Sequence, residues 1–334
     1  MPCTVIVCGF FGDTGKGKII SYLALKDKLS VAVRAGVGPN AGHTVVYGDK
    51  TFKVRMVPSA FVYERCRLLI GPGVIVDPNV FLNEVNLLNV EKRVGLDPQC
   101  AIIELKHIEA DRSGHLASEI GTTGSGTGPC NADRVMRRAK IARDIPELWK
   151  FLRDVPLEVN NAIDSGENVL VEGTQGTFLS LWHGTYPYVT SKDVTASAAC
   201  SDVGIGPKKV DDVIVVFKAY VTRVGAGPLP GEISWEEAER RGWAEIASVT
   251  GRRRRAAPFN FDLAKRAVML NSATQAAVTK IDAVFPECKG ARSFNDLSAE
   301  AREFIRKIES EIKIPVTLIG TGPEVWDMVD RRFE

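Results

Sequence analysis

The sequence predicts an α/β protein with a large, mostly parallel central sheet and helices on both faces. Short runs of β-branched residues end in glycine or polar turns and lead into helical patterns, an alternation typical of parallel sheets. The runs are nearly all apolar, as expected of strands that are covered on both faces. A glycine-rich turn follows the first run and precedes the first helical pattern, and such turns bind phosphate on backbone N–H groups.

Apolar runs predict strands at residues 4–8, 31–34, 68–70, 101–105, 169–172, 213–222, 277–281 and 315–319. Apolar residues at helical spacing predict helices at residues 16–26, 78–88, 145–165, 235–247, 262–270 and 298–312. The second helix has the clearest start, because Asp77 can cap it and Pro78 suits its first position. No repeat or linker divides the sequence, so residues 1–334 are expected to form one domain with elaborating loops and subdomains.

Charge and composition exclude several classes of function. The 43 basic and 41 acidic residues give a net charge of +2, which lends no support to a nucleic-acid partner. The seven cysteines form no regular pairs and no C-x-x-C motif, as in proteins of a reducing cytoplasm. No apolar stretch approaches the roughly 18 residues that would span a bilayer. We therefore expect a soluble cytoplasmic protein with neither nucleic acid nor membrane as a partner.

Residues 9–17 read G-F-F-G-D-T-G-K-G and are the most informative segment. Their spacing departs from a standard P-loop, because Gly15 follows Gly9 one residue too late and Gly17 replaces the usual Ser or Thr ligand of magnesium. Asp13 then becomes the natural magnesium ligand or proton acceptor, and Lys16 the phosphate ligand. An ordinary turn that closes a strand–helix unit is the simpler interpretation. The segment favours a P-loop NTPase-like fold.

Four further glycine-rich segments follow predicted strands, at residues 36–44, 173–177, 225–228 and 320–323. Each could be an ordinary turn. Ligands of open parallel sheets bind beyond the carboxyl ends of the strands, so the segments together predict a single site at that edge. His43 lies in the first of them. A lone histidine is more often structural, but in this loop it could act as a general acid or as an oxyanion donor.

Three other segments narrow the choice of ligand. In T-K-I-D at 279–282, the Asp282 carboxylate could accept the N1–H and the amine of guanine, which with Lys280 favours GTP over ATP. Residues 121–129 are too rich in glycine and hydroxyl groups for a helix or strand, and suit a second phosphate or a flexible surface loop. In T-G-R-R-R-R at 250–255, adjacent guanidinium groups repel unless an anion compensates them. This predicts a loop for an anionic substrate, rather than a solvated face or a nucleic-acid patch.

Taken in order along the chain, these segments resemble the adenylosuccinate synthetase family. The matching motifs are G-D-x-G-K-G-K at 12–18, N-A-G-H-T at 40–44, G-T-T-G-x-G-x-G-P at 121–129, E-G-x-Q-G-T at 172–177, H-G-T-Y-P-Y-V-T-S at 183–191, R-V-G-A-G-P at 223–228, T-G-R-R-R-R at 250–255, T-K-x-D at 279–282 and T-G-P at 321–323. They cover essentially the whole chain, which resembles the short form found among archaea. Thr14 departs from the pattern, because the family has an acidic residue there.

The resemblance implies a GTP-dependent ligase that joins aspartate to IMP and gives adenylosuccinate, GDP and phosphate. Asp13 would remove the N1 proton of IMP, and Lys16, His43 and Mg²⁺ would neutralise the phosphoryl group that moves from GTP to O6, with Gln175 near the base. Aspartate would then displace the phosphate of 6-phosphoryl-IMP. Two alternatives stay open: a dethiobiotin-synthetase-like P-loop ligase, which explains only the phosphate loop, and a regulatory GTPase that ignores IMP and aspartate.

The resemblance also implies which residues bind each substrate. Those for GTP are Gly12, Gly15, Lys16, Gly17, Lys18, Gly42, His43, Thr44, Lys280, Asp282, Gly320, Thr321 and Gly322. Those for IMP are Asp13, Asn40, Thr123, Arg137, Gln175, Thr190, Val224 and Arg252. Those for L-aspartate are Thr250, Gly251, Arg252 and Arg254, and those for magnesium are Asp13 and the Gly42 carbonyl. A homodimer is implied too, in which Arg137 crosses the two-fold interface to the IMP phosphate of the other subunit.

Overall fold

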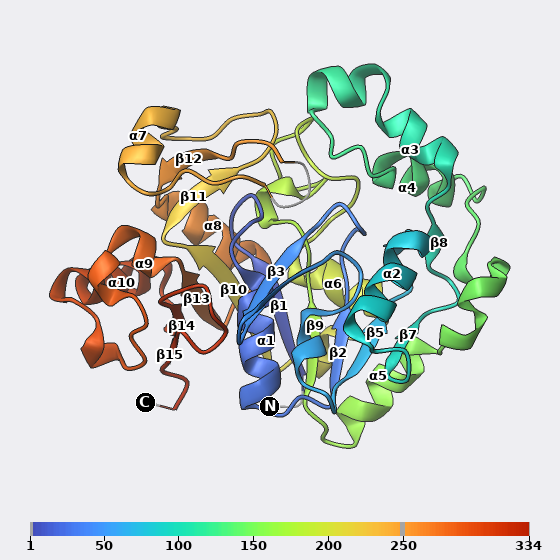
Figure 1. Ribbon diagram of the computed structural model, residues 1–334, viewed down its shortest axis with the longest axis horizontal. Helices are drawn as coiled ribbons and strands as arrows, with labels where there is room; N and C mark the ends of the chain where they lie inside the picture. The colour runs from blue at the N-terminus through green and yellow to red at the C-terminus, as the bar shows by residue number, and fades with distance from the viewer. Residues whose placement is uncertain (1–2, 248–250, 334) are drawn as a thin grey trace.

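The computed structural model describes residues 3–247 and 251–333, which are built around a nine-stranded sheet (Figure 1). All neighbouring strands are parallel except the last pair, β14 and β15. Across the sheet the order is β15 (Met328–Asp330), β14 (Val316–Gly320), β13 (Gln275–Thr279), β10 (Asp212–Lys218), β1 (Cys3–Cys8), β9 (Val169–Glu172), β2 (Val31–Arg34), β5 (Arg67–Ile70) and β7 (Val94–Leu96). The prediction of an α/β protein with a large, mostly parallel sheet is confirmed.

Smaller sheets and helices surround this sheet. The two-stranded sheets pair β11 (Tyr220–Arg223) with β12 (Arg255–Pro258), β3 (His43–Tyr47) with β4 (Lys50–Val54), and β6 (Ile75–Val76) with β8 (Ala101–Ile102). The α-helices are α1 (Lys16–Lys26), α2 (Pro78–Leu88), α3 (Leu105–Asp111), α4 (Thr127–Val135), α5 (Val155–Asp164), α6 (Ala196–Val203), α7 (Trp235–Arg240), α8 (Phe261–Asn271), α9 (Ile281–Val284) and α10 (Ala299–Ile312).

Two predicted strands were wrong in detail. The run 213–222 is two strands, because the chain leaves the central sheet at Ala219 and β11 pairs with β12 instead. The run 101–105 is mostly not a strand: β8 stops at Ile102, and α3 begins at Leu105 with a capping box between Glu104 and His107. The short strands β7 and β15 were not predicted, since three residues carry too little pattern to stand out.

Three helix assignments also need correction. The predicted helix 145–165 is a 3₁₀ turn at Pro146–Phe151 followed by α5, because Pro156 suits only a first turn and the Asp154 carboxylate caps the Leu157 N–H at 3.1 Å. The predicted helix 235–247 ends as α7 at Arg240, shortly before Gly242 at φ 70°. The segment 121–129 was expected to contain no helix, yet α4 begins at Thr127.

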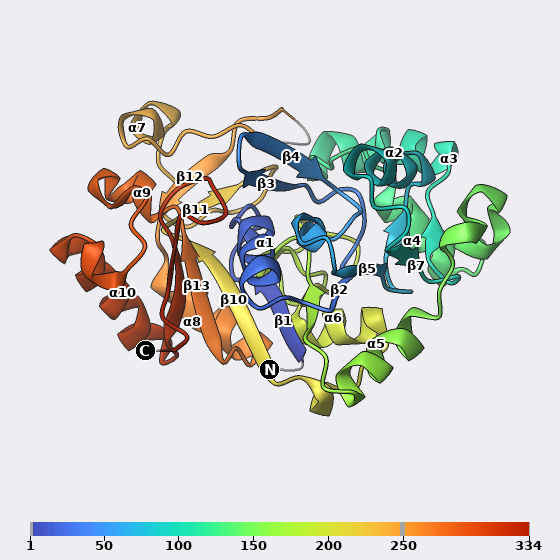
Figure 2. The same cartoon turned by 60° about the horizontal axis from the view of Figure 1, so that its bottom comes forward.

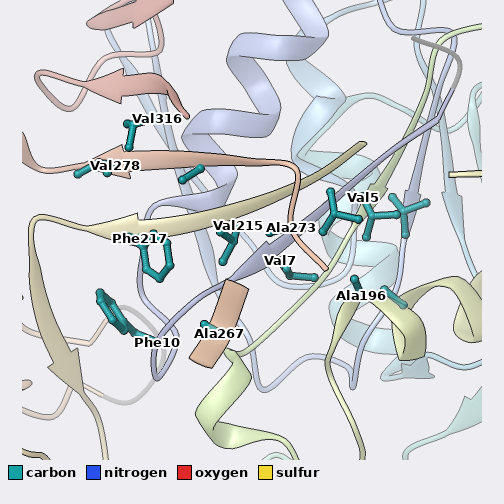
Figure 3. Packing of buried hydrophobic residues seen from close by; sticks show 14 of the residues in the cluster. Val5, Val7, Phe10, Ala196, Val215, Phe217, Ala267, Ala273, Val278 and Val316 are labelled. Carbon is teal, nitrogen blue, oxygen red and sulfur yellow. The ribbon is translucent and has the colours of Figure 1, made fainter. Parts of the chain in front are cut away.

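The core consists of two apolar layers, one on each face of the sheet. In β1, Val5 and Val7 pack on one face and Ile6 on the other, and β10 alternates in the same way. Figure 3 shows Val5 and Val7 in the first layer, where Ala196 of α6 and Ala267 of α8 also lie. Helix α1 covers the opposite face. Because both faces are buried, the strands read as continuous apolar runs.

The parallel strands direct their carboxyl ends to one edge of the sheet. In Figure 1 this is the upper edge, and Figure 2 shows the β3–β4 hairpin and the β11–β12 pair beyond it. The loops that follow β1, β2, β9 and β14 therefore start close together. Within the described part of the chain, no helix is long and apolar enough to cross a membrane.

Candidate active site

A cavity of about 480 Å³ opens at the carboxyl edge of the sheet. Its wall takes residues from the loop after β1, from 40–46, from Gln175, from 223–226 and from 322–323. These are the five glycine-rich segments, so the prediction that they converge is confirmed. The segments 121–123, 188–191 and 279–280 and the arginine loop also contribute to the wall.

The loop after β1 is shaped by left-handed residues at Gly12 (φ 89°), Asp13 (φ 55°) and Gly15 (φ 76°). Helix α1 starts directly afterwards, so its N-terminal N–H groups face the cavity, as in sites for phosphate. Gly17 stands where a P-loop has Ser or Thr. A Cβ there would come within 2.9 Å of the His43 Cβ, so the glycine makes room for β3 and its histidine.

Both lysines of this loop are buried and already hydrogen-bonded. The Lys16 ammonium donates to the Gln175 carbonyl at 2.8 Å, and burial lowers its pKa. The Lys18 ammonium donates to the carbonyls of Gly322 and Asp327, each at 2.6 Å, and burial lowers its pKa to about 8. Lys16 lies beside the glycine loop and can turn to a phosphate, whereas Lys18 ties α1 to the loop after β14.

A buried ion cluster holds His43 in place through its Nδ1. The Glu172 carboxylate, at the end of β9, lies 2.5 Å from His43 Nδ1 and accepts from Arg34 of β2 at 2.6 Å. It also accepts from the Ser59 N–H at 2.7 Å and from the Ser59 hydroxyl at 2.8 Å. Burial alone would raise the pKa of Glu172, but Arg34 and His43 lower it to about 2. Burial and the nearby Arg34 lower the pKa of His43 to about 4, so the imidazole is neutral at pH 7 and donates from Nδ1 to an ionised carboxylate.

The Asp13 carboxylate is paired with the arginine loop. Its Oδ1 accepts from Arg254 Nη2 at 2.9 Å, and the other edge of the same guanidinium pairs with Glu245. Lys218, which is buried at the end of β10, lies 3.2 Å from Glu245. Burial would raise the pKa of Glu245, but Lys218 and Arg254 lower it to about 2. These residues therefore form a second ion cluster at the cavity, apart from that of His43.

The predicted guanine segment is shaped for a ligand but only partly lines the cavity. Lys280 is a wall residue in the left-handed region (φ 62°), and Thr279 fixes the segment by donating to the Thr14 carbonyl at 2.8 Å. Asp282, in α9, is not among the residues of the wall. Its Oδ1 is nevertheless buried and has no hydrogen-bond partner among the described residues, which is unusual for a carboxylate.

All the residues predicted for IMP except Arg137 line the cavity. Gln175 (φ 50°) donates to Asn40 Oδ1 at 3.0 Å, and Arg252 donates to the carbonyls of Gly121 and Thr122 at 2.9 and 3.1 Å. Arg252 thus joins the arginine loop to the hydroxyl-rich segment. Further predicted residues that belong to the wall are Gly42, Thr44, Thr123, Thr190 and Val224.

Some predicted residues lie elsewhere. Arg137 (φ 60°) is exposed just after α4 and does not line the cavity. Gly251 is also outside the wall, Gly320 is the last residue of β14, and the Thr321 hydroxyl donates to the Ala291 carbonyl at 2.8 Å. Thr250 lies outside the described residues. The binding roles of these residues therefore stay predictions.

Sequence reasoning gave no role to five charged residues that hold the predicted site residues or their loops in place: Arg34, Glu172, Lys218, Arg223 and Glu245. Arg223 is buried and donates to the carbonyls of Tyr188 and Pro228 at 2.8 Å, which holds the loop after β11 against residues 185–188. The available signal was a charged residue at the end of an apolar strand, since Arg34, Glu172 and Lys218 each occupy such a position. A charge buried there requires a partner.

The cavity fits a magnesium nucleotide better than a free metal ion. Among residues 3–247 and 251–333, no group of three or more His, Cys, Asp or Glu side chains could hold a metal. Mg²⁺ usually takes one or two carboxylates together with phosphate oxygens and water. Asp13, next to the glycine loop and on the cavity wall, can supply the single carboxylate of such a site.

Comparison with known proteins decides the family. The family model described as adenylosuccinate synthetase matches residues 5–151 and 139–287. The chain belongs to the adenylosuccinate synthetase family. It is 59% identical to the adenylosuccinate synthetase of Methanocaldococcus jannaschii, over 100% of this chain and 98% of that one. It is 56% identical to that of Archaeoglobus fulgidus, over 100% and 99% of the two chains. As a member of this family, the chain is a GTP-dependent ligase of purine biosynthesis.

Solved structures agree with the fold. The fully ligated adenylosuccinate synthetase of Plasmodium falciparum superimposes with a TM-score of 0.91, and the match covers 98% of this chain and 99% of that one. At 23% identity this comparison speaks for the fold alone. The succinoaminodeoxyadenylate synthetase of cyanophage S-2L, bound to dGMP and dATP, gives 0.81 at 27% identity over 99% and 95% of the chains.

Proposed function

We propose that this chain joins L-aspartate to IMP at the expense of GTP, through 6-phosphoryl-IMP, and that the cavity beyond the sheet is where both steps occur. The observation that carries the proposal is the meeting of three groups in one cavity wall: the carboxylate of Asp13, the imidazole of His43 and the guanidinium of Arg254. They correspond to a base, a hydrogen-bond donor to the phosphate and a ligand for the aspartate carboxylate, which this reaction needs together.

In the first step Asp13 takes the N1 proton of IMP, which moves negative charge onto O6 and makes it a nucleophile. In the structure Asp13 forms an ion pair with Arg254, with 2.9 Å between Oδ1 and Nη2. To meet IMP, Asp13 has to leave Arg254, and the guanidinium edge that it frees can then take another anion. The carboxylate of aspartate is such an anion, and Arg252 and Arg254 are its proposed ligands.

His43 assists the same step from the phosphate side. Its Nδ1–H donates to ionised Glu172, so its Nε2 carries a proton only in the imidazolium form. A phosphate anion in the cavity would stabilise that form, with Glu172 as the second anionic partner. His43 can then donate to the γ-phosphate as charge develops there, and Lys16 adds a second positive group. When bound, Mg²⁺ held by Asp13 and the Gly42 carbonyl would supply further charge neutralisation.

We further propose a homodimer that acts in the cytoplasm and in which Arg137 serves the partner's site. Arg137 is exposed and lies outside its own cavity wall, as a residue that crosses an interface would. Two inactive variants, Arg137→Leu and Asp13→Asn, should regain roughly a quarter of the activity after random subunit exchange, because one site in each hybrid is intact. Absence of recovery despite proven exchange would assign Arg137 no role across the interface.

GDP release measured with and without each substrate tests the proposed reaction. It should require both IMP and aspartate, and the product should absorb as adenylosuccinate. Steady GTP hydrolysis that ignores both substrates would instead support a regulatory GTPase. GDP release without a new purine product would contradict the ligation of aspartate.

A further inference from the structure

Glu245 lies at the centre of the ion cluster beneath the arginine loop. Lys218 donates to both of its oxygens at 3.2 Å, and the Tyr220 hydroxyl donates to one of them. Arg254 donates to the other oxygen, and the Lys280 ammonium lies 4.0 Å away. Three cations therefore meet at one carboxylate, whose side chain is only 14% exposed.

This carboxylate joins the central sheet to the arginine loop. Lys218 is the last residue of β10 and is almost completely buried, so it is a fixed anchor. Arg254 belongs to the loop and uses one edge of its guanidinium for Glu245 and the other for Asp13. Asp13, Glu245 and Arg254 all line the cavity, but Glu245 is also held by Lys218 and Tyr220 and is the less exposed carboxylate, 14% against 24% for Asp13. The edge on Asp13 is therefore the one that a substrate carboxylate can take.

We propose that Glu245 is a positioning residue for aspartate: anchored by Lys218, it holds one edge of Arg254 so that the other edge can pass from Asp13 to the substrate carboxylate. The inference rests on the proposed function and adds a residue to it. Without Glu245, Arg254 would keep Asp13 as its acidic partner in this cluster, and the substrate would compete with an ion pair to the proposed base itself.

A purely structural role predicts different behaviour. If Glu245 only neutralised Lys218, its loss would affect folding and the use of all substrates alike. If it acts through Arg254, its loss should selectively raise the KM for aspartate. In a variant that already lacks Arg254, the loss of Glu245 should then have no further effect on that KM.

The matched control is Glu232. It pairs with Arg255 of the same arginine run, with Arg255 Nε 2.7 Å from Glu232 Oε1, but neither residue lines the cavity. We expect Glu245→Gln to raise the KM for aspartate roughly tenfold or more, since a charge-assisted contact is lost, and to leave the KM for IMP within about threefold. Glu232→Gln should change neither value.

The double variant Arg254→Leu/Glu245→Gln gives the decisive number. Its KM for aspartate should equal that of Arg254→Leu within about twofold. Effects that multiply, or an aspartate KM in Glu245→Gln no higher than in Glu232→Gln, would overturn the proposal.

Folding is controlled with Lys218→Met/Glu245→Gln, which removes the buried cation together with its partner. This variant should fold and show the same selective rise in the KM for aspartate. Failure of both it and Glu245→Gln to fold would assign Glu245 to the core and overturn the proposal. If the wild-type chain releases no GDP in response to aspartate, the proposed function fails and this inference with it. Normal wild-type activity with an unaffected Glu245→Gln variant rejects the inference alone.

Discussion

The two ion clusters at the cavity are built in contrasting ways. Around His43, the side chains of Arg34 and Glu172 are fully buried and come from the ends of central strands. Around Asp13, the side chains of Asp13, Glu245 and Arg254 are 12–24% exposed and Lys218 is buried, and Arg254 comes from a loop. The first cluster is fixed by the sheet, while the second combines one sheet residue with loop residues. The difference teaches that the proposed phosphate side is preorganised by the sheet, while the proposed aspartate side depends on loop contacts.

The largest effect is expected from Asp13, the proposed base of the first step. Asp13→Asn keeps the size of the side chain but cannot take the N1 proton, so kcat should fall by about 10³-fold or more. Binding of GTP and IMP, measured by calorimetry, should stay within about tenfold of wild type, since an amide keeps most of the contacts. Retained turnover would show that another group is the base.

A smaller effect, on the KM for aspartate, is expected on the loop side. Arg252→Leu and Arg254→Leu should each raise the KM for aspartate by about two orders of magnitude, because a charge-assisted contact to a carboxylate contributes roughly 1.5–3 kcal/mol. Steady-state kinetics with each substrate varied in turn measures this. An unchanged aspartate KM together with a lower melting temperature would make the arginine run a structural feature.

The segment predicted to bind guanine, residues 279–282, is tested through the choice of nucleotide. The buried Asp282 oxygen that has no partner among the described residues is suited to accept from a base. Asp282→Asn should lower kcat/KM for GTP by roughly tenfold and raise it for xanthosine triphosphate, whose extra carbonyl would meet an amide donor. The ratio of kcat/KM for the two nucleotides decides the matter. Equal losses for both would exclude Asp282 from the base site.

The smallest effect concerns stability in mild acid. His43 has an ordinary pKa of 6.5 that burial lowers to about 4, so the unfolded chain binds this proton first and stability falls as the pH drops below 6.5. Between pH 6.5 and 5.5 the loss should be about 1 kcal/mol. Urea unfolding of wild type and His43→Asn measures it, and the variant should lose less over this range. Parallel curves would mean that His43 titrates normally.

The sequence predicted the sheet and most of the cavity wall, but not the two clusters. Helices α1 and α2 were predicted to the residue, because a glycine turn and an Asp-Pro start mark their beginnings. The pairing of Glu172 with His43, and of Glu245 with Lys218, joins parts of the chain that are far apart in the sequence. Local pattern carries no information on such pairs. The division into one domain stays a prediction.

Exchange of ¹⁸O between the β–γ bridge and the β non-bridging positions of GTP tests the contrast most directly, because it reports reversible phosphoryl transfer without product formation. With IMP present and aspartate absent, wild type should scramble the label. Arg254→Leu should scramble it at a rate within about tenfold of wild type, while His43→Asn should reduce the rate by about 10²-fold or more. Loss of scrambling in Arg254→Leu as severe as in His43→Asn would contradict the account, because the phosphate side would then depend on the aspartate loop.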